Sequence, residues 1–300
     1  MDAFLQVLYA EELVKNSEKQ LESTTEQLSL AGERLNLSII SQSDYLQVKS
    51  QLASEKLTLA NATSQFTIAR VNLMQLMELP VRENIVFAHP DMNEVTNQDR
   101  IPDSRAVYNT ALEIKPQVKY AALNTEIAKY DEKIAHASYF PGLSMNAGVG
   151  TGYSSLTGNE GYFTQMNNRI SPSIGLNLSI PIFQRKQVKT NVSNARIGIQ
   201  NAELSEIDTK NQLRKAVEQA SVNVTSAQIE YEASLEQYNS NQESYALATE
   251  KFDQGLINSV DYLFEKTNLI VAESQLLQSK YKLIYSYKIL DFYTGVPLTL

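Results

Sequence analysis

The sequence predicts a mainly α-helical protein that is built from long antiparallel coiled-coil helices, with one β-hairpin inserted between two helical repeats. Three observations support this fold class. Glycine and proline are sparse, at 11 and 8 of 300 residues, which favours long uninterrupted helices. Two segments of the chain repeat each other with helical periodicity. The region between them changes to a period of two, which is typical of strands.

The composition excludes several classes of function. The net charge is −8 and no block of lysine and arginine is present, so we expect no nucleic-acid partner. There is no cysteine, which excludes disulfides, thiolate metal sites and cysteine nucleophiles. The two histidines, His89 and His136, are too few and too far apart for a metal cluster. No nucleotide-binding or catalytic motif occurs, and we expect neither an enzyme nor a cofactor.

The chain shows no signal for a membrane-spanning helix or for export. No apolar run reaches the ~18–20 residues that a transmembrane helix needs. Residues 1–6 lack the basic start and the apolar stretch of a signal peptide. We therefore expect a signal peptide, if the protein is exported, to lie outside this sequence, and the chain to begin partway into a longer reading frame.

An internal repeat relates the first part of the chain to the last. An Asp-Tyr-Leu triplet begins at Asp44 and again at Asp261, an offset of 217 residues, and both copies end at a proline, Pro80 and Pro297. This offset is 31 heptads, so both copies keep the same coiled-coil phase, with apolar residues recurring every seven positions. The core of an ordinary helical bundle shows the same spacing, so the heptads alone leave open whether the helices form a duct.

Each repeat is predicted to fold as an antiparallel helical hairpin. The first hairpin spans residues 1–78 with a helix break at 36–43, and the second spans residues 185–293 with a break at 253–260. The helix that enters the second break has about 70 residues without a proline, which corresponds to roughly 105 Å. A helix of that length indicates an elongated bundle or coiled coil and excludes a compact globule.

The two helix breaks expose aliphatic pairs beside polar turns. Gly255 can take the left-handed conformation that ends a helix, and Ser38 stands at the equivalent position of the first break. The tip residues of interest are Ser38, Ile39, Ile40, Gly255, Leu256 and Ile257. Such apolar residues serve either as a local staple or as a docking site. Asp44 and Asp261 each lie in the first turn of the next helix, where the helix dipole also favours them.

Residues 139–184 are predicted to form a β-hairpin with an outer loop at 154–170. Two runs of nearly ten residues alternate between aliphatic and small polar residues. The aliphatic positions are Leu143, Met145, Val149, Ile174, Leu176, Leu178, Ile180 and Ile182. Aromatic residues suited to a lipid–water boundary flank the runs, namely Tyr139, Phe140, Tyr153 and Phe183.

This alternation favours a transmembrane β-barrel, whose strands need ~9–11 residues, an apolar exterior and a polar interior. A half-buried hairpin in a soluble sheet alternates in the same way. Two strands cannot close a barrel, so we expect further strands from an earlier part of the protein, from other protomers, or from both. The small size of the polar residues and the long flanking helices favour the barrel.

These features together resemble the TolC-like outer-membrane efflux family. The segment 252–263 resembles the family's tip signature, aromatic-x-x-Gly-x-x-Ser-x-x-Asp-x-Leu. Residues 139–144 resemble the start of a barrel strand, 179–183 its end, and 291–298 the end of the second repeat. Phe264 departs from the pattern, because some relatives carry a second carboxylate at that position, which puts a double acidic ring in doubt.

The resemblance implies a homotrimer in which each protomer gives strands to one shared transmembrane β-barrel and helices to a coiled-coil barrel. It implies a place in the outer membrane of a Gram-negative bacterium, with the helices in the periplasm. It also implies a passive channel that works with a periplasmic adaptor protein and an inner-membrane pump, in efflux or type I secretion. A non-channel helical scaffold or an adaptor-like coiled-coil protein is the alternative, because either would show the heptads.

The resemblance also implies roles for particular residues. Asp44 and Asp261 would form the periplasmic gate, and the two tips would dock the adaptor. Residues 79–115 and the tail 294–300 would form an equatorial segment, and residues 116–138 the helix that leads to the barrel. The aliphatic strand residues would face outer-membrane lipid.

Overall fold

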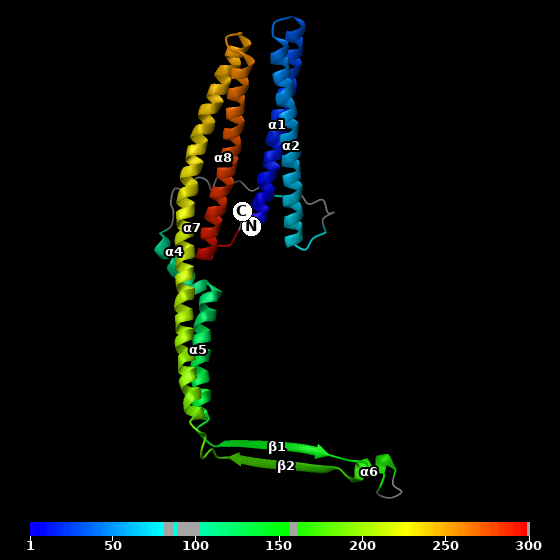
Figure 1. Cartoon of the computed structure of the whole chain (residues 1–300), viewed down its shortest axis with the longest axis vertical. Coiled ribbons are helices and arrows are strands. Elements are labelled where there is room, and N and C mark those ends of the chain that lie inside the picture. The colour runs from blue at the N-terminus through cyan, green and yellow to red at the C-terminus, as the bar shows by residue number, and fades with distance from the viewer. Residues whose placement is uncertain (81–86, 89–102, 157–160, 299–300) are drawn as a thin grey trace. The chain divides into compact units, whose positions relative to one another are not determined.

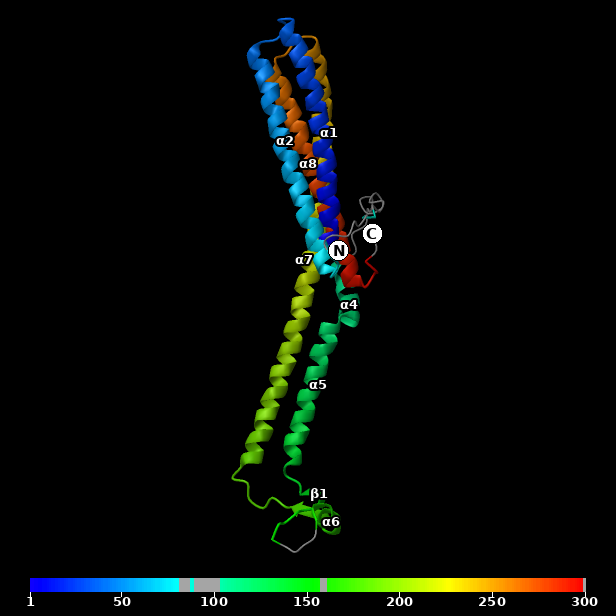
Figure 2. The same ribbon diagram turned by 90° about the vertical axis from the view of Figure 1, so that its right-hand side faces the viewer.

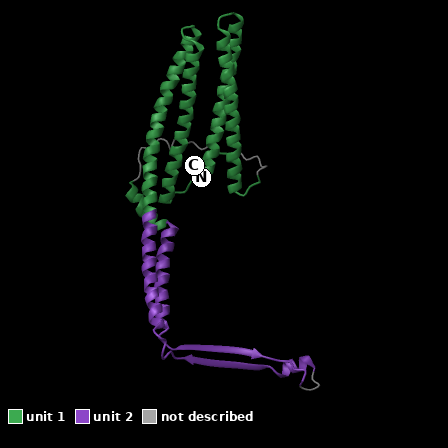
Figure 3. Cartoon of the chain, in the orientation of Figure 1, with its two compact units in different colours: residues 1–114, 213–300 green, residues 115–212 purple. Residues whose placement is uncertain are grey.

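The computed structural model describes residues 1–80, 87–88, 103–156 and 161–298. This part of the chain is mainly helical and contains one two-stranded antiparallel sheet (Figure 1). The chain divides into two compact units, residues 1–114 with 213–300, and residues 115–212 (Figure 3). The prediction of a mainly helical chain with an inserted β-hairpin is therefore confirmed. None of the described helices has the combination of length and apolar character that crossing a membrane requires.

The first unit consists of two helical hairpins and a short helix. Helices α1 (Asp2–Asn36) and α2 (Gln42–Leu76) form the first hairpin. The C-terminal part of α7 (Gln187–Asp253) and α8 (Ser259–Thr294) form the second. Helix α8 contacts both α1 and α2, and it also packs against α4 (Ser104–Ile114). The two hairpins thus lie side by side with their tips at the same end (Figure 2).

The apolar core of the first unit lies away from the hairpin tips. The largest fully buried apolar side chains there are Val7, Leu8, Met74, Val107, Val217, Val224, Leu283, Ile284 and Leu290. They come from all five helices of the unit, as the seven-residue apolar stripes require. Toward the tips the buried set includes polar side chains such as Thr24, Glu55 and Lys266. The hairpins are therefore joined by apolar packing at one end and by polar contacts at the other.

Helices α1 and α7 end in the same backbone turn. Ser38 and Gly255 both have left-handed backbones, with φ of 58° and 73°. The Ile39 N–H donates to the carbonyl of Arg34 at 2.8 Å, and the Leu256 N–H donates to that of Lys251 at 2.8 Å. This is the Schellman motif, in which glycine is the favoured left-handed residue. Ser38 at the first tip thus has the left-handed backbone that Gly255 has at the second tip.

We expect Ser38→Gly to raise the free energy of unfolding by about 1 kcal/mol, because it removes the steric cost of a left-handed non-glycine residue. Urea titration followed by circular dichroism measures this change. Ser50→Gly is the matched control, since Ser50 is exposed within α2, where glycine should instead lower stability by about 0.5 kcal/mol. A loss of stability in Ser38→Gly would show that the serine side chain contributes more than its strain costs.

The second unit contains α5 (Pro116–Ala137), the N-terminal part of α7 and the two strands. Pro116 occupies the first turn of α5, where its missing N–H costs no hydrogen bond. The Arg196 guanidinium contacts the Glu132 carboxylate at 2.8 Å, and the Thr125 hydroxyl donates to Glu206 at 2.9 Å. Polar contacts therefore join α5 to α7 within this unit.

Strands β1 (Gly142–Gly150) and β2 (Ser171–Ser179) pair over nine residues each. The register sets Gly142 opposite Ser179 and Gly150 opposite Ser171. The alternation in the sequence continues to Ile182, but β2 ends at Ser179, so Ile180 and Ile182 lie beyond the strand. Pro181 explains the end, because it has no N–H to donate to a ladder.

Two of the predicted segments contain short helices. The outer loop predicted at 154–170 contains a short helix, α6 (Tyr162–Asn168). The predicted equatorial segment 79–115 includes α4, and much of the rest of it lies outside the described residues. A Gly- and Asn-rich composition therefore did not exclude a helical turn in the outer loop.

Candidate functional site

One face of the paired strands is aliphatic and exposed. Leu143 lies opposite Leu178, Met145 opposite Leu176, and Ala147 opposite Ile174. The large side chains of this face range from 60 % exposed at Leu178 to 76 % at Ile174. The opposite face carries only small or amide side chains, namely Ser144, Asn146, Gly148, Ser173, Gly175 and Asn177. An aliphatic face this exposed indicates an apolar medium or partner.

Aromatic side chains flank this sheet at both ends. Tyr139 and Phe140 precede β1, and Phe183 follows β2; all three are exposed. Beyond the other ends of the strands, the rings of Tyr153 and Tyr162 lie 5.2 Å apart. Phe163, which the sequence also places at this far side, lies with its ring centre 5.4 Å from that of Tyr162 and is also exposed. The aromatics thus lie beyond both ends of the strands, and two of them are on the short helix α6.

At each hairpin tip, one aliphatic residue of the pair is exposed and the other is half-buried. Ile39 and Leu256 are 66 % and 69 % exposed. Ile40 instead lines a cavity of about 230 Å³ between the hairpins, together with Val48 and Phe252. Ile257 lines a separate groove on the second hairpin. Ser38 and Gly255 form the turns themselves, so one side chain of each aliphatic pair is free to contact a partner. At the first tip, Leu37 is also exposed.

Asp44 and Asp261 occupy equivalent sequence positions but different surroundings. Asp44 accepts hydrogen bonds from the backbone N–H of Ser41 at 3.2 Å and from its hydroxyl at 2.7 Å, within a capping box. It also accepts a hydrogen bond from the Ser259 hydroxyl, which lies on the other hairpin. The contact of Asp261 at the start of α8 is made by its backbone, because its N–H donates to the Asn258 side chain at 2.9 Å. Its exposed side chain borders the groove that contains Ile257 and Phe264.

The Asp44 contact should make the hairpin junction sensitive to acid. The hydrogen bonds from Ser259 and then from Ser41 lower the pKa of Asp44. A carboxyl whose folded pKa is lowered stabilises the fold above its unfolded pKa, and that contribution is lost as the pH falls below about 4. We expect Ser259→Ala to move the pKa of Asp44 back toward its ordinary value. Carboxyl titration by NMR checks this, and an unchanged pKa in Ser259→Ala would contradict it.

Arg34 joins the two tips across the cavity. Its guanidinium lies 3.0 Å from the Asp253 carboxylate and 5.5 Å from the centre of the Phe252 ring. Phe252 in turn stacks on Tyr262, with ring centres 4.7 Å apart. An ion pair and a cation–π contact thus connect α1 to the end of α7.

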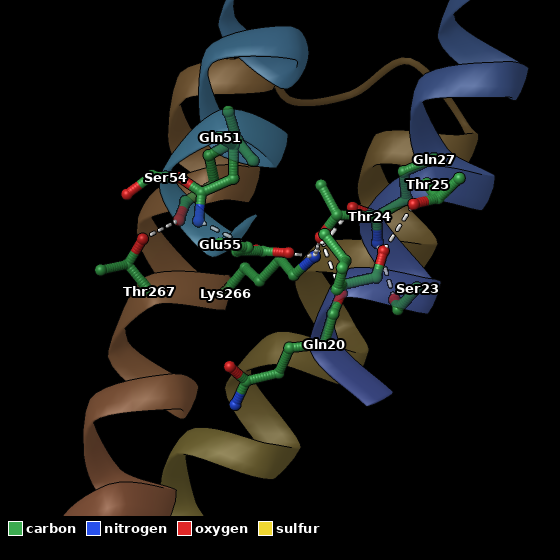
Figure 4. Close-up of polar contacts among 12 residues, drawn as sticks. Gln20, Ser23, Thr24, Thr25, Gln27, Gln51, Ser54, Glu55, Lys266 and Thr267 are labelled. Atoms are coloured by element: carbon green, nitrogen blue, oxygen red, sulfur yellow. Dashed lines mark hydrogen bonds and ion pairs between the residues drawn. The ribbon is translucent and has the colours of Figure 1, made fainter. Parts of the chain in front are cut away.

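A buried ion pair lies deeper between the hairpins. The Lys266 ammonium is 3.5 Å from the Glu55 carboxylate, and the side chains are only 5 % and 6 % exposed. The ammonium also donates to Gln27 Oε1 at 3.1 Å and to the Thr24 hydroxyl, and Gln51 donates to Glu55 at 3.0 Å. Figure 4 shows Lys266 extended between Glu55 and Thr24. Helices α1, α2 and α8 therefore meet at one charged contact.

Tyrosines extend this polar contact to the fourth helix. Gln27 donates to the Tyr262 hydroxyl at 2.5 Å, and that hydroxyl lies 2.7 Å from the Tyr245 hydroxyl on α7. Burial raises the pKa of Tyr262, so its hydroxyl stays protonated. Burial also lowers the pKa of Lys266, while the nearby Glu55 opposes that shift. Sequence reasoning missed this network, although Glu55 interrupts a buried stripe between Val48 and Ala62.

The described residues offer no arrangement of His, Asp or Glu side chains that could hold a metal ion. The ring centres of His136 and Tyr139 lie 5.3 Å apart, and His89 lies outside the described part of the chain. The features with functional potential are thus the exposed strand face, the tips and the contact between the hairpins.

Comparisons with known proteins identify a family and relatives that share this architecture. The sequence profile of the family described as "Outer membrane efflux protein" matches residues 107–296. The outer membrane protein TolC of Salmonella enteritidis is 22 % identical over 93 % of this chain and 57 % of its own length. This chain thus spans a little over half the length of that curated relative.

Solved structures share the fold at low sequence identity. A membrane protein of Pseudomonas aeruginosa superposes with a TM-score of 0.77 at 18 % identity, covering 97 % of this chain and 64 % of its own. The open state of the MtrE outer membrane channel of Neisseria gonorrhoeae superposes with a TM-score of 0.75 at 18 % identity. That match covers 98 % of this chain and 64 % of the MtrE chain. The fold is therefore that of TolC-like channels.

Proposed function

Because this chain belongs to the outer membrane efflux protein family, we propose that it is part of one protomer of a homotrimeric outer-membrane duct. The duct passively carries substrates from a periplasmic adaptor and an inner-membrane pump to the exterior. The observation that supports this most directly is the exposed aliphatic face of β1 and β2, which matches what lipid requires of a barrel strand. The helical hairpins then form the periplasmic tunnel.

The strand pair accounts for only a share of the barrel. Nine residues per strand is close to the ~9–11 that a tilted transmembrane strand needs. The edges of β1 and β2 must be paired in lipid, because unpaired backbone groups are costly there. Strands from the remainder of the protein and from two further protomers would close the cylinder. The exposed aromatics at both strand ends would lie at the lipid–water boundaries.

The function is tested with the complete gene product in outer-membrane vesicles and planar bilayers. A duct gives a heat-modifiable trimer in the membrane fraction and stable single-channel currents. A non-channel scaffold or an adaptor-like coiled coil gives a protein without current, and that result would reject the proposal.

The two gate candidates differ in exposure, since Asp261 is exposed while Asp44 is half-buried and accepts a hydrogen bond from Ser259. Asp261→Asn should therefore reduce cation selectivity in planar bilayers more than Asp44→Asn.

The tips are proposed as the docking site of the periplasmic adaptor. Leu256 and Ile39 project from the two turns, and apolar side chains at such positions suit contact with a partner helix. We expect Leu256→Asp to abolish co-purification of the adaptor, because it buries a charge in that contact. Leu57→Asp is the matched control, since Leu57 is equally exposed but lies within α2, away from the turn. Retained co-purification in Leu256→Asp would exclude the tip as the docking site.

A further inference from the structure

We propose that the buried Glu55–Lys266 pair fixes the axial register between the two helical hairpins. The pair joins α2 of the first hairpin to α8 of the second. Among the ion pairs within the described part of the chain, it is the one with both side chains buried. A pair placed there constrains how far one hairpin can slide along the other. This inference concerns the packing of the hairpins and does not depend on the transport function.

Around this pair, the neighbouring buried side chains alone would leave the register ambiguous. On α2, the residues one heptad before and after Glu55 are Val48 and Ala62, and both are buried. On α1, the residues one heptad before and after Thr24 are Ser17 and Ala31, and both are also buried. If α8 slipped by one heptad, the first hairpin would therefore present similarly small side chains to it.

The charged pair makes such a slip costly. Lys266 contacts Thr24, and seven residues later on α8 Glu273 accepts a hydrogen bond from Gln20, so α1 and α8 run antiparallel. In a one-heptad slip Lys266 would face either Ala62 with Ser17 or Val48 with Ala31. Its ammonium would then lose Glu55, and the carboxylate of Glu55 would also be left without its counter-charge. Two uncompensated buried charges disfavour both slipped registers.

The pair also disfavours packing of one second hairpin against another. The 217-residue repeat places Ala272 at the position equivalent to Glu55 and Lys49 at the position equivalent to Lys266. Two copies of the second hairpin would therefore bring Lys266 against Ala272, with no carboxylate to meet the ammonium. Two copies of the first hairpin would still bring Lys49 against Glu55, so the pair disfavours only the contact between two second hairpins.

The sequence has no cysteine, so introduced cysteine pairs can report the register. Gln20→Cys with Glu273→Cys reports the native register, since these side chains are 3.1 Å apart. Leu13→Cys with Glu273→Cys reports a slip of one heptad. Each pair is cross-linked with a short bis-maleimide in the full-length protein in membranes. With Glu55 and Lys266 intact, only the native reporter should cross-link.

The register should become mixed when the pair is replaced by apolar residues. In Glu55→Leu with Lys266→Met, the slip reporter should rise from background to roughly a third of the chains, because the registers become comparable. Exchange of the charges, Glu55→Lys with Lys266→Glu, should restore cross-linking by the native reporter alone. The neutral variant Glu55→Gln with Lys266→Gln serves if the apolar variant fails to fold.

Two results would overturn the proposal. One is native-only cross-linking in both the apolar and the neutral variants, since the register would then be set by other contacts. The other is a slipped register in the charge-exchanged variant, since complementary charge would then not be the determinant. The readout is a cross-link and requires no transport, so its outcome is independent of the planar-bilayer test of the proposed function.

Discussion

Glu55→Leu as a single substitution is expected to lower the free energy of unfolding by about 3–5 kcal/mol, which is typical when one partner of a buried ion pair is removed. The loss arises because Lys266 stays buried without its carboxylate, next to the neutral side chains of Thr24 and Gln27. Urea unfolding of the purified protein, followed by circular dichroism, measures the change. Adding Lys266→Met should recover most of the loss, because no buried charge then remains.

A surface pair provides the matched control for this prediction. Lys282 and Glu230 also join two helices, but their side chains are 52 % and 45 % exposed. Glu230→Leu should therefore change the free energy of unfolding by less than about 1 kcal/mol. An effect of Glu55→Leu as small as that of Glu230→Leu would mean that Lys266 reaches water in the assembled protein.

Leu176→Arg is expected to reduce sharply the amount of the proposed trimer in the outer membrane. Leu176 lies in the middle of the aliphatic face of β2, where an arginine facing lipid costs about 2–4 kcal/mol near the bilayer midplane. In a trimer each protomer would contribute this cost, so the assembly would be destabilised by three times this free energy. The heat-modifiable band on a gel of the membrane fraction measures the amount assembled.

Asn177→Arg is the matched control for the strand prediction. Asn177 is the next residue of β2 and lies on the opposite, small and polar face. The same charge placed there should leave most of the trimer in place, because that face is proposed to line water. An equal loss of trimer in both variants would show that the two faces share one environment, which contradicts the proposed barrel.

Much of the fold could be predicted because it follows from short-range patterns. Alternation of aliphatic and small residues located both strands, and the register confirms that Leu143, Met145, Ile174, Leu176 and Leu178 share a face. The scarcity of proline predicted the long helices. The end of β2 at Ser179 was predicted less well. The alternation of residue types continues past Pro181, although a proline interrupts the hydrogen bonds between the strands.

The contacts between hairpins could not be predicted from the repeat. Asp44 and Asp261 match in sequence, yet only Asp44 receives a hydrogen bond from the other hairpin. Glu55 and Lys266 are separated by more than 200 residues and have no charged counterpart pair in the repeat. Such pairs depend on which helices meet and in which register, which is long-range information that a periodic pattern lacks.

The proposed location of the strands is tested most directly by spin labels on single cysteines at successive positions from Leu143 to Val149. The chain has no native cysteine, so every label reports one site. In outer-membrane vesicles, oxygen dissolved in lipid should relax the labels at Leu143, Met145 and Val149, and a water-soluble nickel chelate those at Ser144 and Asn146. Equal access of the nickel chelate to both sets of positions would contradict a lipid-facing strand and the duct built on it.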